Sequence, residues 1–130
     1  MSIIFLGCRL GREVSQLAFQ ETQLERDGVA FHLKLLDLEN AVVAFFYEKS
    51  MRLGTLAFAL PRLMEGTAVT SSILLGGKYL IITRSLAERI AVLLKKMSLV
   101  SVYTGLQEAE AFRIFAELLD VAVSQRKSTP

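Results

Sequence analysis

The spacing of hydrophobic residues changes after Leu75. Up to that point, short apolar runs are separated by turn residues, which is typical of successive antiparallel strands. From Lys78 onward, apolar residues recur at steps of three and four, which is typical of amphipathic helices. The pattern predicts strands at residues 14–25, 29–36, 41–47, 53–60, 67–75 and 99–103, and helices at 80–97 and 104–124.

This order of elements predicts an α+β fold with an antiparallel sheet of about six strands and two helices packed on it, rather than a doubly wound α/β fold. The 130 residues are enough for one core, so we expect a single domain at residues 1–123 and a polar C-terminal tail at 124–130. The run at 41–47 is apolar at both odd and even positions. It therefore predicts a central strand covered on both sides.

Some positions carry more specific local signals. Asp27-Gly28 predicts a hairpin turn, because glycine readily adopts a positive φ. Residues 104–107 match a capping box that would begin the second helix. The expected buried stripe of the first helix is Ile82, Leu86, Ile90, Leu93 and Met97, and that of the second is Phe112, Phe115, Leu119 and Val123.

Hydrophobic residues form 52% of the chain, and the mean hydropathy is +0.43. This excess indicates either a membrane segment or a surface buried against a partner. The longest clean apolar run, residues 41–47, is far shorter than the ~18 residues a membrane helix needs, so no membrane span is expected. The apolar N-terminus lacks the features of a signal peptide, and the single cysteine, Cys8, suits a reducing compartment. We expect the protein in the cytosol, with the nucleus as a second location.

The charge distribution argues against nucleic acid as a partner. The net charge is only +2, and basic and acidic residues are interspersed along most of the chain. Proteins that bind nucleic acids usually gather positive charge on one face.

Catalytic chemistry has little support in the sequence. The chain has one histidine and one cysteine, His32 and Cys8, and they share no local motif. A hydrolase triad or a metal site needs several such groups to converge. We interpret His32 as a partly exposed sheet residue and Cys8 as a small apolar side chain, and we expect no enzyme activity, cofactor or metal.

Gly76-Gly77-Lys78, just before the first predicted helix, invites comparison with a phosphate-binding loop. The Walker pattern fails at two positions, because Ser72 stands where its first glycine should be and Tyr79 where its Ser/Thr should be. A strand-to-helix turn is the favoured interpretation. A small-molecule binding protein or enzyme that uses this turn as an anion site is the alternative.

Four consecutive apolar residues, Tyr79, Leu80, Ile81 and Ile82, stand at the start of the same helix. A helix that buries one face cannot bury four consecutive side chains equally. Either the sheet or a partner must cover those that remain, so these four residues are our candidate partner-binding site.

Five short markers occur in order along the chain: Phe31-His32, Leu56 to Ala59, Val69 to Gly76, Ala87 to Ala91 and Val100 to Tyr103. In order and spacing the chain resembles the proteasome assembly chaperone 4 family, with weaker similarity to assembly chaperone 3. The likeness runs over most of the chain. It departs from the family at residues 78–82, where the family has a polar stretch rich in Ser and Thr.

The resemblance implies a sheet of about six strands with two helices. It also implies a heterodimer with a chaperone 3-like subunit, which helps proteasome α subunits assemble into the ring of the 20S particle. The alternative is another interaction module, such as a dimeric scaffold of the roadblock/longin type, in which a small sheet with helices also dimerises.

Overall fold

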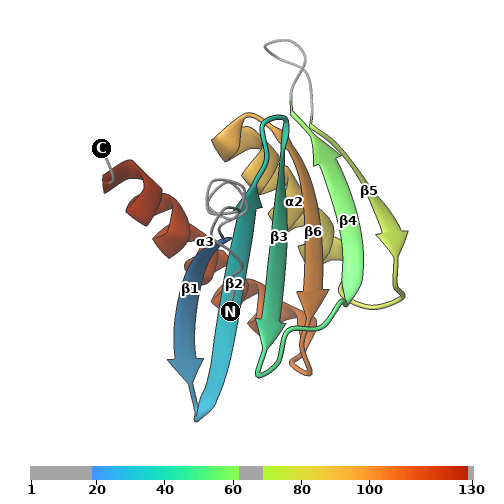
Figure 1. The fold of residues 1–130 in the computed structure, drawn as a ribbon. Helices are drawn as coiled ribbons and strands as arrows, with labels where there is room; N and C mark the ends of the chain where they lie inside the picture. Colours follow the sequence, from blue (N-terminus) through green and yellow to red (C-terminus); the bar gives the residue numbers. More distant parts are fainter. Residues whose placement is uncertain (1–18, 62–68, 129–130) are drawn as a thin grey trace, which may run out of the picture.

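The computed structural model describes residues 19–61 and 69–128. Within these ranges the chain is an α+β fold with six strands and two helices, as the sequence predicts (Figure 1). In chain order the elements are β1 (Phe19–Arg26), β2 (Val29–Asp37), β3 (Ala41–Glu48), β4 (Thr55–Leu60), β5 (Thr70–Leu75), α2 (Leu80–Leu94), β6 (Met97–Tyr103) and α3 (Glu108–Ser128).

The six strands form one mixed sheet in the order β1-β2-β3-β6-β4-β5. Four of its pairings are antiparallel, but β3 and β6 are parallel, so the expectation of a wholly antiparallel sheet is wrong at this pairing. The cause is α2, which carries the chain back across one face of the sheet, from the end of β5 to the opposite end of the strands, where β6 begins (Figure 1). A crossover of this kind lets β6 run in the same direction as β3.

The turn between β1 and β2 follows the sequence prediction. Asp27 and Gly28 both have positive φ, 53° and 78°. Two such residues suit a type I′ turn, whose twist matches that of the flanking strands. The hairpin is in register from Phe19 opposite Leu36 to Arg26 opposite Val29.

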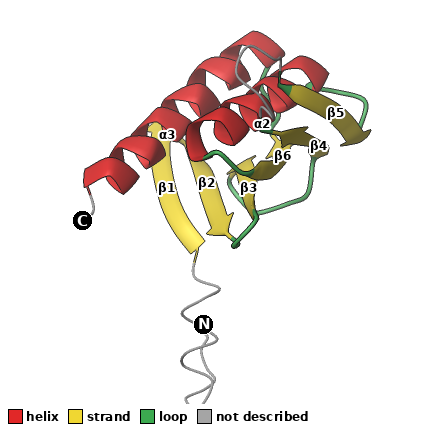
Figure 2. Ribbon diagram, turned by 90° about the horizontal axis from the view of Figure 1, so that it is seen from above, coloured by secondary structure: helices red, strands yellow, loops and turns green. Residues whose placement is uncertain are grey.

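Both helices pack on the same face of the sheet (Figure 2). Helix α2 lies over β4, β5 and β6, and α3 lies over β1 and β2. The ring of Phe115 on α3 meets Phe31 and Phe46 edge-on, with centroid distances of 6.0 and 5.4 Å. These rings and the aliphatic side chains around them form one core between sheet and helices.

The first helix ends earlier than predicted. Lys95 has φ 57°, a left-handed conformation that stops α2, and Met97 already begins β6. Ile82, Leu86 and Ile90 are buried as expected, but Leu93 and Met97 are 43% and 37% exposed. Periodicity alone does not reveal where a helix gives way to a strand when both are apolar.

The second helix begins later than predicted. Its first residue is Glu108, because Thr104 does not cap it: the Thr104 hydroxyl instead accepts a hydrogen bond from the Leu106 amide, in a turn before the helix. Phe115 and Leu119 are buried as expected, and Val123 is half-buried. Phe112, however, is 36% exposed.

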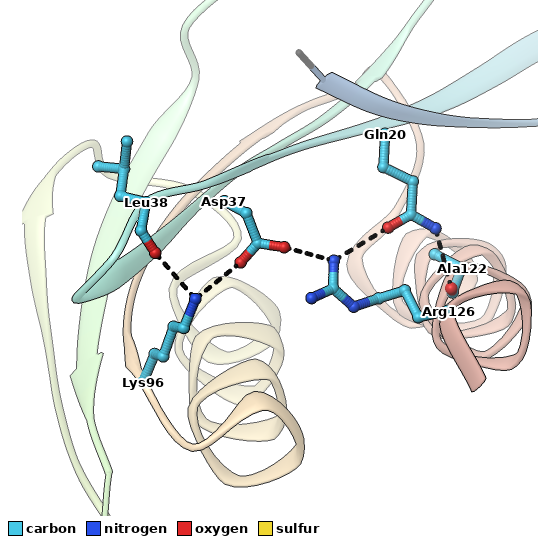
Figure 3. A network of polar contacts seen from close by, with 6 residues as sticks. All are labelled: Gln20, Asp37, Leu38, Lys96, Ala122 and Arg126. Atoms are coloured by element: carbon cyan, nitrogen blue, oxygen red, sulfur yellow. Dashed lines mark hydrogen bonds and ion pairs between the residues drawn. The ribbon is translucent and has the colours of Figure 1, made fainter. Parts of the chain in front are cut away.

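Helix α3 continues through Ser128, so much of the expected tail is helical. Near its end Arg126 joins a polar network with Asp37 and Gln20 (Figure 3). Residues 14–18 of the first expected strand and 67–68 of the fifth lie outside the described residues. The single domain at residues 1–123 stays a prediction.

Candidate interaction surfaces

The face of the sheet opposite the helices is one candidate surface. No described helix or strand covers it (Figures 1 and 2). We call it the outer sheet face. Its larger side chains include His32, Lys34, Leu36, Val43, Phe45, Tyr47, Leu56, Phe58, Leu60, Leu99 and Tyr103, from the four adjacent strands β2, β3, β6 and β4.

Strand register places the apolar members of this face side by side. Leu36 lies opposite Val43, Val43 opposite Leu99, and Leu99 opposite Phe58. This row crosses four strands without a polar side chain. Phe45 lies beside the row on β3, and apart from Tyr47 and Leu60 these larger side chains are half-buried. Because large exposed apolar patches on soluble proteins often mark interaction sites, this row makes the outer sheet face a candidate.

Polar groups lie toward the β1–β2 side of the outer sheet face. Lys34 Nζ lies 3.5 Å from the carboxylate of Glu21, and the His32 ring stacks on Tyr47 at a centroid distance of 4.9 Å. An apolar centre with a polar rim is the usual composition of a protein interface.

The sequence predicted that β3 would be covered on both sides. The helices cover one side, whereas no described element covers the other. The sequence motifs did not mark this face as a site. The signal was nevertheless present, because β3 and β4 are apolar at both odd and even positions, and a strand facing water on one side normally alternates.

The structure divides the four candidate residues Tyr79, Leu80, Ile81 and Ile82. Ile82 is buried in the core, at 3% exposure, and Tyr79 is half-buried. Leu80 and Ile81 remain 40% and 73% exposed. Only Leu80 and Ile81 are therefore free to contact a partner, and their partner role stays a prediction.

Tyr79 has a structural role at the start of α2. Its φ of 58° is left-handed, and its side chain does not cap the helix. The phenol oxygen instead lies 2.6 Å from the Leu106 carbonyl oxygen and 3.0 Å from that of Thr104. Burial raises the pKa of this phenol, and the nearby charges of Glu48 and Glu108 raise it further. It is therefore a neutral hydrogen-bond donor at physiological pH.

The start of α2 does not offer an open phosphate site. Glu108 Oε2 accepts hydrogen bonds from the backbone amides of Ile81 and Ile82, both at 3.1 Å. The donors that would bind an anion are thus engaged by a carboxylate of the chain itself. Gly76 and Gly77 form the turn between β5 and α2, and the positive φ of Gly76, 110°, explains the need for glycine there.

His32 and Cys8 are the residues on which catalysis or metal binding would depend. His32 lies on the outer sheet face, and Cys8 lies outside the described residues. Across residues 19–61 and 69–128, no three His, Cys, Asp or Glu side chains are grouped as a metal site would require. Neither described helix, α2 or α3, is both long enough and apolar enough to cross a membrane.

Comparison with known proteins gives a structural match. No family model matches the chain, and no curated protein matches its sequence. The fold is similar to a chain in the crystal structure of a chaperone complex for yeast 20S proteasome assembly, with a TM-score of 0.56 and 16% sequence identity. The match covers 82% of this chain and 97% of that chain. At this identity the likeness shows a shared fold.

Proposed function

We propose that this chain is one subunit of a heterodimeric chaperone that pairs with a chaperone 3-like subunit and promotes assembly of the proteasome α ring. Two findings support the proposal. The ordered sequence markers and the fold point to the same group of proteins. The outer sheet face, apolar and without a described covering element, supplies the surface that a dimer needs, and it is the observation that carries the proposal.

In this proposal the outer sheet face binds the chaperone partner. Two sheets packed face to face bury their apolar inner surfaces about 10 Å apart. Phe45 and the row from Leu36 to Phe58 would form the centre of the interface, and His32 and Lys34 would lie near its rim. A stable interface buries ~800 Å² on each partner, which favours a whole sheet face over a small patch.

Binding, rather than chemistry, would be the mechanism. A chaperone of this kind covers apolar surface or a strand edge on an unassembled subunit and leaves when the next subunit competes for the same surface. The proposal therefore requires no catalytic residue or cofactor. It places the protein in the cytosol or nucleus.

The first experiment tests the interface. The chain is co-expressed with a chaperone 3-like subunit, and light scattering measures the mass of the purified complex. Phe45→Glu and Leu99→Glu should each weaken pairing by roughly 30-fold or more, since a charge at the centre of an interface is left unpaired. Val121→Glu is the matched control, because Val121 is 42% exposed on α3, away from the sheet.

A loss of pairing can be assigned to the interface only if the substituted chain still folds. Circular dichroism and the melting temperature of each variant alone must show a folded chain. Unchanged pairing in folded Phe45→Glu and Leu99→Glu variants would exclude the outer sheet face as the dimer interface.

The second experiment tests the biological role. Co-purification from cells should recover a chaperone 3-like subunit and proteasome α subunits with few mature particles. Recovery of neither would overturn the proposal. Membrane-traffic or GTPase-regulatory partners would instead support the roadblock/longin-type scaffold.

A further inference from the structure

A hollow of about 600 Å³ opens between the start of α2 and the loop that precedes α3. Both segments lie at the end of the sheet where β5 and β6 finish (Figure 1). Leu80, Ile81 and Leu106 supply apolar side chains to its wall, and Lys78 and Glu108 supply charges. We call it the α2–α3 hollow.

The wall of the α2–α3 hollow is held in place from three directions. The Tyr79 phenol bonds to the loop before α3. The Glu48 carboxylate accepts hydrogen bonds from the Thr104 hydroxyl and, at 2.7 Å, from the Gly105 amide. Glu108 bonds to the first turn of α2. A site formed before binding loses less conformational entropy when a ligand enters.

The hollow has an apolar side chain exposed at its wall. Ile81, at 73%, is the most exposed of the large hydrophobic residues that the structure describes. The first turn of α2 buries Ile82 instead, so the helix cannot also cover Ile81. Exposed apolar area of this kind is stabilised when a partner covers it.

The two charged side chains that line the hollow, Lys78 and Glu108, differ in their contacts within the chain. The Glu108 carboxylate is engaged by two amides at the positive end of the α2 dipole. The Lys78 side chain, by contrast, has no hydrogen-bond or ion-pair partner among the described residues, and Lys78 is exposed. An acidic group on a partner would complement it.

We propose that the α2–α3 hollow receives one or two apolar side chains of an extended acidic segment on an unassembled proteasome α subunit; the identity of this client rests on the proposed function. The volume falls within the 300–1,000 Å³ range of ligand pockets, which suits a short segment. A second copy of the chain would need a much larger contact area. The hollow is built from the starts of the two helices, on the opposite side of the sheet from the outer sheet face, so both surfaces can be occupied together (Figure 2).

The direct test uses two labelled peptides and fluorescence anisotropy with the purified chaperone pair. One peptide alternates Leu and Phe with Glu, and the other carries Lys in place of Glu. The acidic peptide should bind about tenfold more tightly. Lys78→Glu should reverse that preference, and Ile81→Ser should weaken both peptides while Val121→Ser weakens neither.

Two results of the peptide test would overturn the inference. One is equal binding of the acidic and basic peptides to the unmodified chain. The other is an equal loss of peptide affinity in Ile81→Ser and Val121→Ser, because Val121 does not line the hollow and the loss would then have another cause. The reversal by Lys78→Glu is a gain of binding for the basic peptide, so misfolding cannot produce it.

Capture of α subunits by the chaperone pair provides the second test. Ile81→Ser and Lys78→Glu should lower recovery roughly fivefold or more while the mass of the pair stays unchanged. If the unmodified pair captures α subunits and both variants capture them equally well, the hollow is not the client site and the proposed function stands. If the unmodified pair captures no α subunits, the proposed function fails. The peptide-binding experiment then decides by itself whether the hollow binds an acidic apolar segment. The mass in solution of the unmodified chain without its partner is compared with that of the Ile81→Ser variant. A lower mass for the variant would identify a second copy of the chain as the occupant and overturn the inference.

Discussion

Arg126 Nη1 lies 2.6 Å from Asp37 Oδ2, and this ion pair joins the last turns of α3 to the end of β2. Lys96 Nζ approaches the other oxygen of the same carboxylate at 3.1 Å and also donates to the Leu38 carbonyl (Figure 3). Gln20 accepts from Arg126 and donates to the Ala122 carbonyl. One carboxylate therefore connects the sheet to the end of α3 and to the turn after α2.

The first prediction concerns the pH dependence of stability at Asp37. Burial alone would raise the pKa of this carboxyl, but hydrogen bonds from Arg126 and Lys96 and their positive charges lower it below 3.8. The folded state thus binds its proton more weakly than the unfolded chain. The stabilisation is fully present above pH 3.8 and is lost as the pH falls through the folded-state pKa.

Asp37→Asn should therefore reduce the free energy of unfolding by roughly 1 kcal/mol at pH 7, a modest value because the carboxylate is partly exposed. The difference from the unmodified chain should shrink below pH 3.8. Urea unfolding at several pH values measures it. Glu21→Gln is the control, since its ion pair with Lys34 is longer and more exposed. A difference that stays constant between pH 7 and the acid range would contradict the prediction.

The second prediction concerns the end of α2. Lys95 has a left-handed conformation, φ 57°, that is sterically unfavourable for a residue with a Cβ atom and that glycine adopts freely. Lys95→Gly should stabilise the fold by up to about 1 kcal/mol in urea unfolding. Val92→Gly, in the interior of the same helix, should destabilise it by about 1 kcal/mol or more. The prediction fails if both substitutions shift stability in the same direction.

The third prediction concerns close packing of two backbones. A Cβ atom at Gly54 would lie 1.9 Å from the Val102 carbonyl oxygen, a backbone atom with little freedom to move. Gly54→Ala should cost about 3 kcal/mol or more, or prevent folding. A Cβ at Gly105 would meet nothing within 4 Å. Gly105→Ala should thus stay within about 0.5 kcal/mol of the unmodified chain, measured by thermal unfolding. Similar melting temperatures for the two variants would refute the packing argument.

The fourth prediction concerns the Tyr79 phenol. Tyr79→Phe removes the hydroxyl that bonds to the loop before α3 and should cost roughly 1 kcal/mol in urea unfolding. Tyr103→Phe is the control, because among the described residues the Tyr103 hydroxyl makes only one hydrogen bond, a long one of 3.5 Å from Arg52 on the surface. The raised pKa of Tyr79 means that its contribution is present below pH 10 and is lost as the pH rises through the folded-state pKa. Equal costs for the two variants would show that the loop does not depend on this hydroxyl.

Local sequence signals were sufficient for most of the fold. Alternation predicted β2, and runs rich in β-forming residues predicted β3, because side chains on a strand point to opposite faces in turn. The turn at Asp27-Gly28 depends on the φ of two neighbouring residues, so its prediction needs no tertiary context. The order of strands and helices followed in the same way.

Other features depend on contacts between distant segments. The parallel pairing of β3 with β6 results from insertion of the last strand between β3 and β4, which no local pattern encodes. Thr104 does not cap the helix because its hydroxyl has other partners. It accepts a hydrogen bond from the Leu106 amide within a turn and donates one to Glu48, which is distant in the sequence. Capping motifs describe what a residue can do locally and omit such competition.

The candidate surfaces also depend partly on local sequence and partly on contacts between distant segments. The sequence by itself determined that the chain has more apolar surface than two helices and one sheet need, and that Tyr79 to Ile82 cannot all be buried by one helix. Only the tertiary structure decided which side chains are left over. Both helices lie on one face, so the apolar residues of the other face stay uncovered, and Ile82 turns into the core while Ile81 turns outward. The amount of apolar surface is a property of composition, whereas its location depends on which face each element buries.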